Sequence, residues 1–229
     1  MTLSDEIRTA IDGKWGHVRE QARATMPGMD LAFDHSLTID QARARVLEQM
    51  KGLIESGIPA AGFAKAHGGL GDPGMAVTGI EMLAQFDLTL MVKSGVQWGL
   101  FGGAVENLGT KRHHATYVPG IISLDVVGCF AMTETGHGSD VQSLETTATF
   151  DPTTDEFIIN SPTASSRKDY IGGAAAHAQI AAVFAQLVTG DENPGVHCFL
   201  VPIRDADGND LTGVTTSDCG YKGGLGGVD

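Results

Sequence analysis

The residues best suited to chemistry lie in one segment near the middle of the chain, residues 128–140, with the sequence GCFAMTETGHGSD. An apolar stretch leads there directly into a loop with glycines and several hydroxyl side chains. Glycine lets a ligand approach the backbone closely, and free N–H groups in such a loop can donate to a phosphate or to the polar edge of a ring. A ligand loop and an ordinary strand-end turn, in which Ser139 and Asp140 satisfy local backbone, are both compatible with this pattern.

A second glycine-bearing stretch, residues 165–173, contains Arg167 and Lys168. They supply the local positive charge that an anionic ligand would need in so acidic a protein. A solvated turn is the alternative interpretation of this stretch.

Other candidate motifs are weaker. Residues 69–74 match GxGxxG, but no convincing strand precedes them and no βαβ alternation follows, so an interhelical loop is favoured over dinucleotide binding. Ser139 lacks the GxSxG context of a nucleophile. The histidines are scattered, with the adjacent His113 and His114 expected on different helix faces, so we predict no metal site.

Helices are predicted for the elements of the first half. Ser4 is expected to cap a first helix, the capping box at residues 38–41 begins a second, and Asp72 with Pro73 begins a third. Further helical predictions are residues 96–108 and a short turn from Thr110 that ends before Pro119. The apolar positions of the three capped helices are Ile7, Ile11, Trp15 and Val18, then Val46, Met50, Leu53 and Ile54, then Met75, Met82, Leu83, Phe86 and Leu90.

The second half is predicted to be β structure, because short runs rich in β-branched and aromatic residues alternate with turn clusters. The expected strands fall within residues 126–132, 144–150, 157–159, 178–188 and 196–203, with turns at 151–155 and 205–209. The fold class is therefore α+β, with an N-terminal α-helical domain at 1–125 and a β-barrel-like middle domain at 126–229. Because the glycine-rich residues 223–229 are followed by no closing element, a truncated chain is expected.

Composition is that of a globular protein, with 42% hydrophobic and 19% charged residues in 229 positions. A net charge of −13 opposes binding to nucleic acid or to an anionic membrane. No segment approaches the roughly 18 apolar residues of a membrane span, and the first residues show no signal-peptide pattern. We therefore expect a cytoplasmic location. The three cysteines lie far apart without a CxxC pair and are expected to be reduced and structural.

Several strings in the same order make the chain resemble the acyl-CoA oxidases of the acyl-CoA dehydrogenase superfamily, from about Pro59 onward. The matching strings are residues 67–72, 100–104, 108–113, 128–139, 144–151, 157–163, 197–205 and 213–215. The resemblance implies a helical N-terminal domain, a middle β-barrel domain and C-terminal helical domains, with FAD held between them. The C-terminal helical domains are expected to be missing from this chain.

The resemblance also implies which residues contact FAD: Phe130, Met132, Thr133, Gly138, Ser139, Tyr170 and Gly172. The first three would line the flavin ring, whereas Gly138 and Ser139 would approach the pyrophosphate or the CoA-bearing substrate. The family string Lys-Trp-Trp-Pro-Gly-Gly is replaced by residues 168–173, KDYIGG. Aromatic packing on the flavin must therefore fall to Tyr170 or be lost.

The implied reaction is α,β-dehydrogenation of a fatty acyl-CoA to trans-2-enoyl-CoA. A carboxylate removes the α-proton, hydride passes from the β-carbon to the flavin, and dioxygen reoxidises the flavin to give hydrogen peroxide. The family's catalytic glutamate lies in the C-terminal helical region, so no catalytic residue is assigned here, Glu134 is taken as structural, and this chain alone is expected to be inactive. The complete enzyme is expected to be a homodimer. The alternatives are an acyl-CoA dehydrogenase that uses an electron carrier and a non-catalytic module that binds FAD or acyl-CoA or assists assembly.

Overall fold

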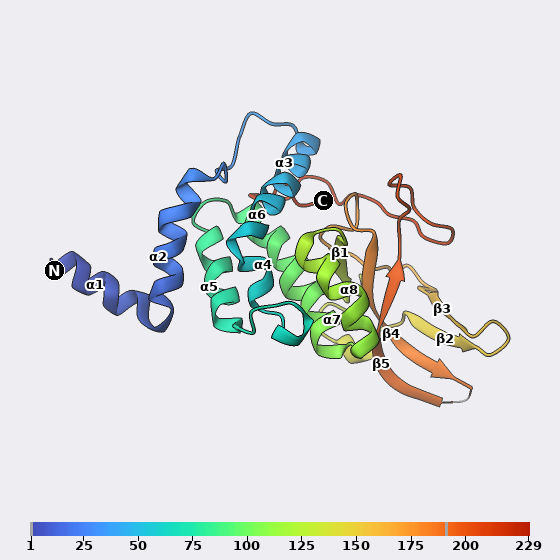
Figure 1. Ribbon diagram of the computed structural model, residues 1–229. Helices are drawn as coiled ribbons and strands as arrows, with labels where there is room; N and C mark the ends of the chain where they lie inside the picture. The colour runs from blue at the N-terminus through green and yellow to red at the C-terminus, as the bar shows by residue number, and fades with distance from the viewer. Residues whose placement is uncertain (1, 191) are drawn as a thin grey trace. The chain divides into compact units, whose positions relative to one another are not determined.

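The structure is a computed structural model that describes residues 2–190 and 192–229 (Figure 1). The chain separates into two compact units. The helical unit comprises the residues up to Asp125 together with Gly220–Val228, and the β unit comprises Val126–Cys219 together with Asp229. The α+β fold class is confirmed, whereas the domain ranges 1–125 and 126–229 stay predictions, because Gly220–Val228 groups with the helices.

The helical unit is built from short helices. Their bounds are α1 (Leu3–Asp12), α2 (Gly16–Thr25), α3 (Ile39–Gly52), α4 (Ile58–Ala61), α5 (Pro73–Leu83), α6 (Leu88–Ser94), a π-helical stretch (Gly95–Phe101), α7 (Gly102–Leu108) and α8 (Lys111–Ser123). Two predicted starts are confirmed: Thr38 caps α3 with a reciprocal bond from Gln41, and the Asp72 carboxylate caps α5 by accepting from the Met75 N–H at 2.8 Å. No helix among the described residues is both long and apolar enough to cross a membrane.

The first helix differs from its prediction. It begins at Leu3, because Thr2 and Asp5 form a capping box in which the Asp5 carboxylate accepts from the Thr2 N–H at 2.8 Å. The expected single helix is divided at Gly13, whose φ is +54°. Ile7 and Ile11 are 50% and 76% exposed, so the predicted apolar stripe is not buried along α1.

Helix α8 also contradicts its prediction, because it continues through Pro119 to Ser123. The last turn is held by tertiary contacts: Ile121 is fully buried, and its carbonyl accepts from Gln97 Nε2 at 3.2 Å and Trp98 Nε1 at 3.0 Å. These bonds satisfy a carbonyl in the last turn of the helix, where intrahelical N–H donors run out.

The β unit holds a five-stranded mixed sheet centred on β4. Its strands are β1 (Gly128–Ala131), β2 (Thr147–Asp151), β3 (Glu156–Asn160), β4 (Ile180–Thr189) and β5 (Glu192–Pro202). β5 pairs with β4 antiparallel, and β3 pairs with β2 across the predicted hairpin loop. The Phe157 and Phe199 rings meet at 5.2 Å although β3 and β5 do not pair, so the sheet curls.

Two parallel strands pair with successive parts of β4. β1 pairs with Ile180–Val183, whereas β2 pairs only with the stretch from Gln186 to Val188. The chain between β1 and β2 leaves the sheet opposite the intervening residues and returns 15 residues later. This excursion, residues 132–146, contains most of the segment singled out for ligand binding.

One hydrophobic cluster in the core of the β unit consists mainly of small side chains. Its buried members are Cys129, Ala131, Ala178, Ala181, Val183 and Ile203. Burial raises the pKa of the Cys129 thiol to about 12, so the thiol is protonated at neutral pH. The three cysteines are not joined to one another: Cys129 is buried, Cys198 is half-buried and Cys219 is exposed, and their predicted structural role stays a prediction.

The GxGxxG match lies in the loop before α5, and packing explains its glycines without a ligand. A Cβ on Gly69 would lie 2.1 Å from the Phe63 carbonyl oxygen, and one on Gly74 would lie 1.9 Å from the Trp15 ring. The predicted interhelical loop is therefore confirmed, since no described strand precedes it.

We expect Gly69→Ala to lower the free energy of unfolding by about 1 to 3 kcal/mol, because the new methyl group must displace buried backbone. Gly103→Ala is the matched control, because Gly103 lies in α7 with no atom within 4 Å of the added Cβ. That change should be neutral or stabilise by up to about 1 kcal/mol, as alanine favours helix. Urea denaturation measures both variants, and equal effects would contradict this account.

Candidate functional site

Two loops of the β unit meet beside the exit of β1. The Thr135 N–H donates to the Arg167 carbonyl at 2.9 Å, and the Gly136 N–H donates to the Ser165 carbonyl at 2.8 Å. Glu134 and Lys168 form an isolated antiparallel bridge between the same loops. The two stretches that the sequence singled out separately are therefore joined by backbone hydrogen bonds. We call residues 132–139 the first loop and residues 165–172 the second loop.

A buried ion pair fastens these loops to the sheet. Lys168 Nζ lies 3.0 Å from Glu134 Oε1, and the two side chains are 13% and 0% exposed. Lys168 Nζ also donates to the carbonyl of Met132 at 3.0 Å and to that of Phe184 at 2.8 Å. Phe184 lies in the part of β4 that pairs with neither β1 nor β2, so the ammonium group fills the gap between those strands.

Both oxygens of the Glu134 carboxylate accept hydrogen bonds from backbone N–H groups. Oε1 accepts from the Thr146 N–H at 3.0 Å, and Oε2 accepts from the Glu145 N–H at 2.8 Å. Burial pushes the pKa of Glu134 up, but hydrogen bonds from Thr146, Glu145 and Lys168 outweigh it and hold that pKa below its usual value. For Lys168 the balance is reversed: burial lowers its pKa, although Glu134 opposes the change. Glu134 is therefore ionised, and its structural role stays a prediction that these contacts support.

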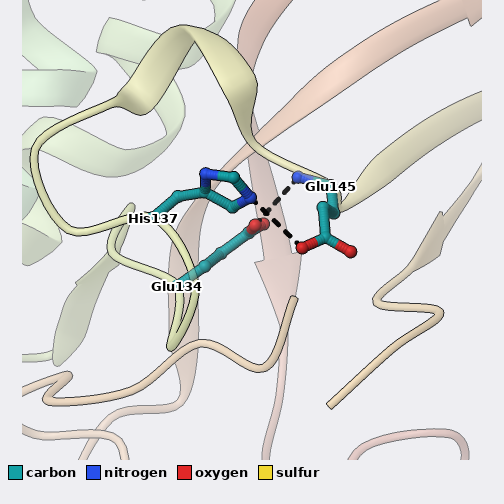
Figure 2. A group of neighbouring side chains, drawn as sticks. All are labelled: Glu134, His137 and Glu145. Atoms are coloured by element: carbon teal, nitrogen blue, oxygen red, sulfur yellow. Dashed lines mark hydrogen bonds and ion pairs between the residues drawn. The ribbon is translucent and has the colours of Figure 1, made fainter. Parts of the chain in front are cut away.

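Figure 2 shows Glu134, His137 and Glu145 turned toward one another. His137 Nε2 lies 3.1 Å from Glu145 Oε1, and Thr163 donates to Glu145 Oε2 at 2.6 Å. Hydrogen bonds from Thr163, Ser165 and His137 lower the pKa of Glu145. The ligand atoms of the three residues lie within 4.8 Å of one another, which is close enough to hold a metal ion.

The Lys168 ammonium already neutralises Glu134, so we interpret this group as a hydrogen-bonded lock. The expectation of no metal site stays a prediction. His137 and Glu145 were not predicted as site residues, and nothing in the spacing of the sequence indicates their contact.

The structure brings together some of the predicted flavin-binding residues. Met132 and Thr133 follow β1 directly and are half-buried, and the Met132 carbonyl is bound by Lys168 of the second loop. Phe130 lies on β1 with its ring 4.9 Å from that of Phe184. Tyr170 on the second loop is 82% exposed and has a φ of +59°, a conformation unusual for a residue other than glycine.

Gly138 and Ser139 lie further along the first loop and are exposed. Within the described residues, no hydrogen bond joins them to Tyr170 or Gly172. The assignment of all seven residues to a flavin site stays a prediction. The residues that sequence reasoning missed are those that hold the loops in place: Glu145, Thr146, His137 and Asp169.

Comparison with known proteins adds independent evidence. Residues 129–229 match the family model of the acyl-CoA dehydrogenase middle domain. The chain is 44% identical over 207 residues to peroxisomal acyl-coenzyme A oxidase 2 of Arabidopsis thaliana, covering 87% of this chain and 29% of that protein. It is 40% identical over 201 residues to peroxisomal acyl-coenzyme A oxidase 3 of the same plant, covering 86% and 29%. The chain thus spans under a third of the length of these relatives.

A solved structure is similar over nearly the whole chain. The crystal structure of acyl-CoA oxidase 1 from Yarrowia lipolytica superposes with a TM-score of 0.82 at 29% identity, covering 93% of this chain and 31% of that one. The expected helical N-terminal and middle β architecture is therefore confirmed.

The predicted cytoplasmic location is wrong, because the relatives from Arabidopsis thaliana are named peroxisomal. The prediction relied on the lack of an apolar segment or signal-peptide pattern. Those features do not separate cytosol from peroxisome, because peroxisomal proteins carry short addresses read by receptors rather than apolar leaders.

We expect Lys168→Met to lower the free energy of unfolding by about 3 kcal/mol or more, because it leaves the buried Glu134 carboxylate without its cation. The double variant with Glu134→Gln should recover part of that loss, giving a coupling energy above about 1 kcal/mol in urea denaturation. Lys51→Met is the control, because the Lys51 and Glu48 side chains are 52% and 69% exposed, and it should cost under about 0.5 kcal/mol. Additive effects of the Glu134 and Lys168 changes would contradict the conclusion that this ion pair stabilises the fold.

Proposed function

We propose that this chain belongs to the acyl-CoA oxidases of the acyl-CoA dehydrogenase superfamily and forms the helical N-terminal and middle β parts of a flavin-dependent acyl-CoA oxidase. The proposed activity of the whole enzyme is conversion of a fatty acyl-CoA to trans-2-enoyl-CoA, with dioxygen reduced to hydrogen peroxide. The proposed cofactor is FAD. The names of the relatives support a peroxisomal setting.

The observation that carries the proposal is a group of free donors at the exit of β1. The N–H and hydroxyl of Thr133 make no hydrogen bond among the described residues, nor do the N–H groups of Gly138 and Ser139. Gly138 is exposed and has no atom within 4 Å of its Cβ position, so a ligand can approach its backbone. The Thr133 donors suit the carbonyl oxygens and ring nitrogens at the polar edge of a flavin, and the N–H groups of Gly138 and Ser139 suit the oxygens of a phosphate.

The remaining predicted residues suit the apolar face of the same ligand. Phe130 and Met132 are half-buried and would exclude water from one side of a bound ring. Tyr170 has an exposed aromatic ring on a left-handed backbone, and strained residues of this kind cluster at ligand sites. When bound, FAD would accept the substrate's hydride and pass the electrons to dioxygen.

No acid of this chain is proposed as the catalytic base. Glu134, the acid closest in sequence to Thr133, is buried and is bound by Lys168, Glu145 and Thr146, so it has no free oxygen to take a proton from substrate. The role of this chain in the proposed reaction is to bind and orient the flavin. The whole enzyme is proposed to act as a homodimer.

We expect the chain to retain FAD through gel filtration, with flavin absorbance in the protein fraction. Thr133→Val should weaken FAD binding by about tenfold in a fluorescence titration, because it removes the free hydroxyl donor. Thr149→Val is the matched control: Thr149 is exposed on β2 of the same unit, its side chain makes no described hydrogen bond, and its variant should bind FAD as the unaltered chain does.

Two results would contradict the proposed function. The first is a colourless protein after incubation with excess FAD and gel filtration. The second is equal FAD affinity in the Thr133 and Thr149 variants, which would exclude the exit of β1 as the place where the flavin edge binds.

A further inference from the structure

Positive charge is scarce in the β unit. Residues 126–219 contain thirteen aspartate and glutamate residues but only three lysine and arginine residues: Arg167, Lys168 and Arg204. A phosphate-bearing ligand on this unit therefore meets a repulsive field, except where one of the three cations is exposed.

Two of the three cations bind groups of the β unit itself. Lys168 Nζ donates to the Glu134 carboxylate and to the carbonyls of Met132 and Phe184. The Arg204 side chain is 4% exposed, and it donates to the carbonyls of Ala174 and Ala178 and to the side chains of Asp210 and Thr216. Only Arg167 remains, with a side chain that is 67% exposed. The structure thus separates the two neighbouring cations that the sequence offered together.

The Arg167 guanidinium is fixed in position but not saturated. Nε donates to Asp169 Oδ1 at 3.0 Å and Nη2 donates to Asp169 Oδ2 at 2.9 Å. The Thr135 hydroxyl donates to the same carboxylate, so Asp169 anchors the guanidinium to the first loop. A guanidinium has five N–H donors, and the described structure occupies two of them. The Nη1 edge is therefore free beside the two loops.

Asp169 orients the guanidinium by binding its Nε and Nη2 donors. The remaining N–H donors, on Nη1 and Nη2, form the second edge of the planar group, and such an edge matches the oxygens of a phosphate. The geometry therefore favours recognition of an anion by the second loop.

We propose that Arg167 is the phosphate-binding residue of the β unit, and that its Nη1 edge donates to the diphosphate of an adenosine-containing ligand seated along the first and second loops. This inference rests on the proposed function, because FAD and CoA both carry such a diphosphate. Asp169 holds the guanidinium in place and competes with the ligand for it. Removing the arginine and removing the competing charge should therefore have opposite effects.

The test is a calorimetric titration of the chain and its variants with inorganic diphosphate. In the unaltered chain, the NMR signal of the Arg167 Nε–H is followed as well. Diphosphate should shift that signal. Its affinity should fall about tenfold or more in Arg167→Gln and rise severalfold in Asp169→Asn, whose amide oxygen still accepts from Thr135. Arg8→Gln is the control: it removes the same charge from an exposed position on α1 and should leave diphosphate binding unchanged.

Parallel titrations with FAD, riboflavin and CoA identify the source of the diphosphate. A tenfold loss of FAD affinity in Arg167→Gln, with riboflavin unaffected, would assign the residue to the flavin cofactor, and a loss confined to CoA would assign it to the substrate. If the unaltered chain binds diphosphate through Arg167 but binds no FAD, the inference stands and the proposed flavin site fails. If Arg167→Gln keeps the affinities of diphosphate, FAD and CoA, or if Asp169→Asn weakens binding equally, the inference is overturned.

Discussion

The contact between Lys168 and Glu134 decides the shape of the β unit around its candidate site. Burying two charges costs free energy that their mutual attraction repays only when every remaining donor and acceptor is satisfied. Here the three donors of the ammonium group have three acceptors, and the carboxylate accepts from two backbone N–H groups as well. The pair is therefore a complete polar network against the buried centre of the sheet.

That network satisfies backbone groups that the strand pairing leaves open. Both β1 and β2 run parallel to β4, and they pair with it at Ile180–Val183 and at Gln186–Val188. The residues of β4 between these two stretches have no strand partner on that side, so their backbone polar groups need another partner. Lys168 satisfies the Phe184 carbonyl there and draws the second loop against the first. Arg204 performs a similar task at the carbonyls of Ala174 and Ala178. A unit with few cations uses two of them to complete its backbone hydrogen bonding, which leaves its surface strongly acidic.

Local signals in the sequence predicted much of the fold. Thr38 with Gln41, and Asp72 with Pro73, set helix starts through side chains within three residues, so the sequence alone indicates them. The same rule should have placed the first cap at Thr2, whose partner Asp5 is three residues on, rather than at Ser4. Pro119 misled the prediction for α8, because the bonds that hold its last turn come from Gln97 and Trp98, more than twenty residues away.

The site was predictable only in part for the same reason. The glycines and hydroxyls of the first loop are visible in the sequence, and the family resemblance attaches a flavin to them. The ion pair between Lys168 and Glu134 joins residues 34 positions apart, and no periodicity or spacing in the sequence indicates such a contact. Arg167 and Lys168 are adjacent and alike in charge, yet the first side chain is 67% exposed and the second only 13%. That difference comes from the gap in the sheet, which only the structure shows.

The central claim is that the first and second loops form one ligand-binding element held by the buried pair. Amide hydrogen exchange of the chain with and without FAD tests it most directly, because exchange reports the opening of each segment separately. The account predicts that FAD slows exchange in residues 132–139 and 165–172 together, with little change in the hairpin of β2 and β3. Protection of one loop without the other, or protection of neither loop by FAD that is demonstrably bound, would contradict it.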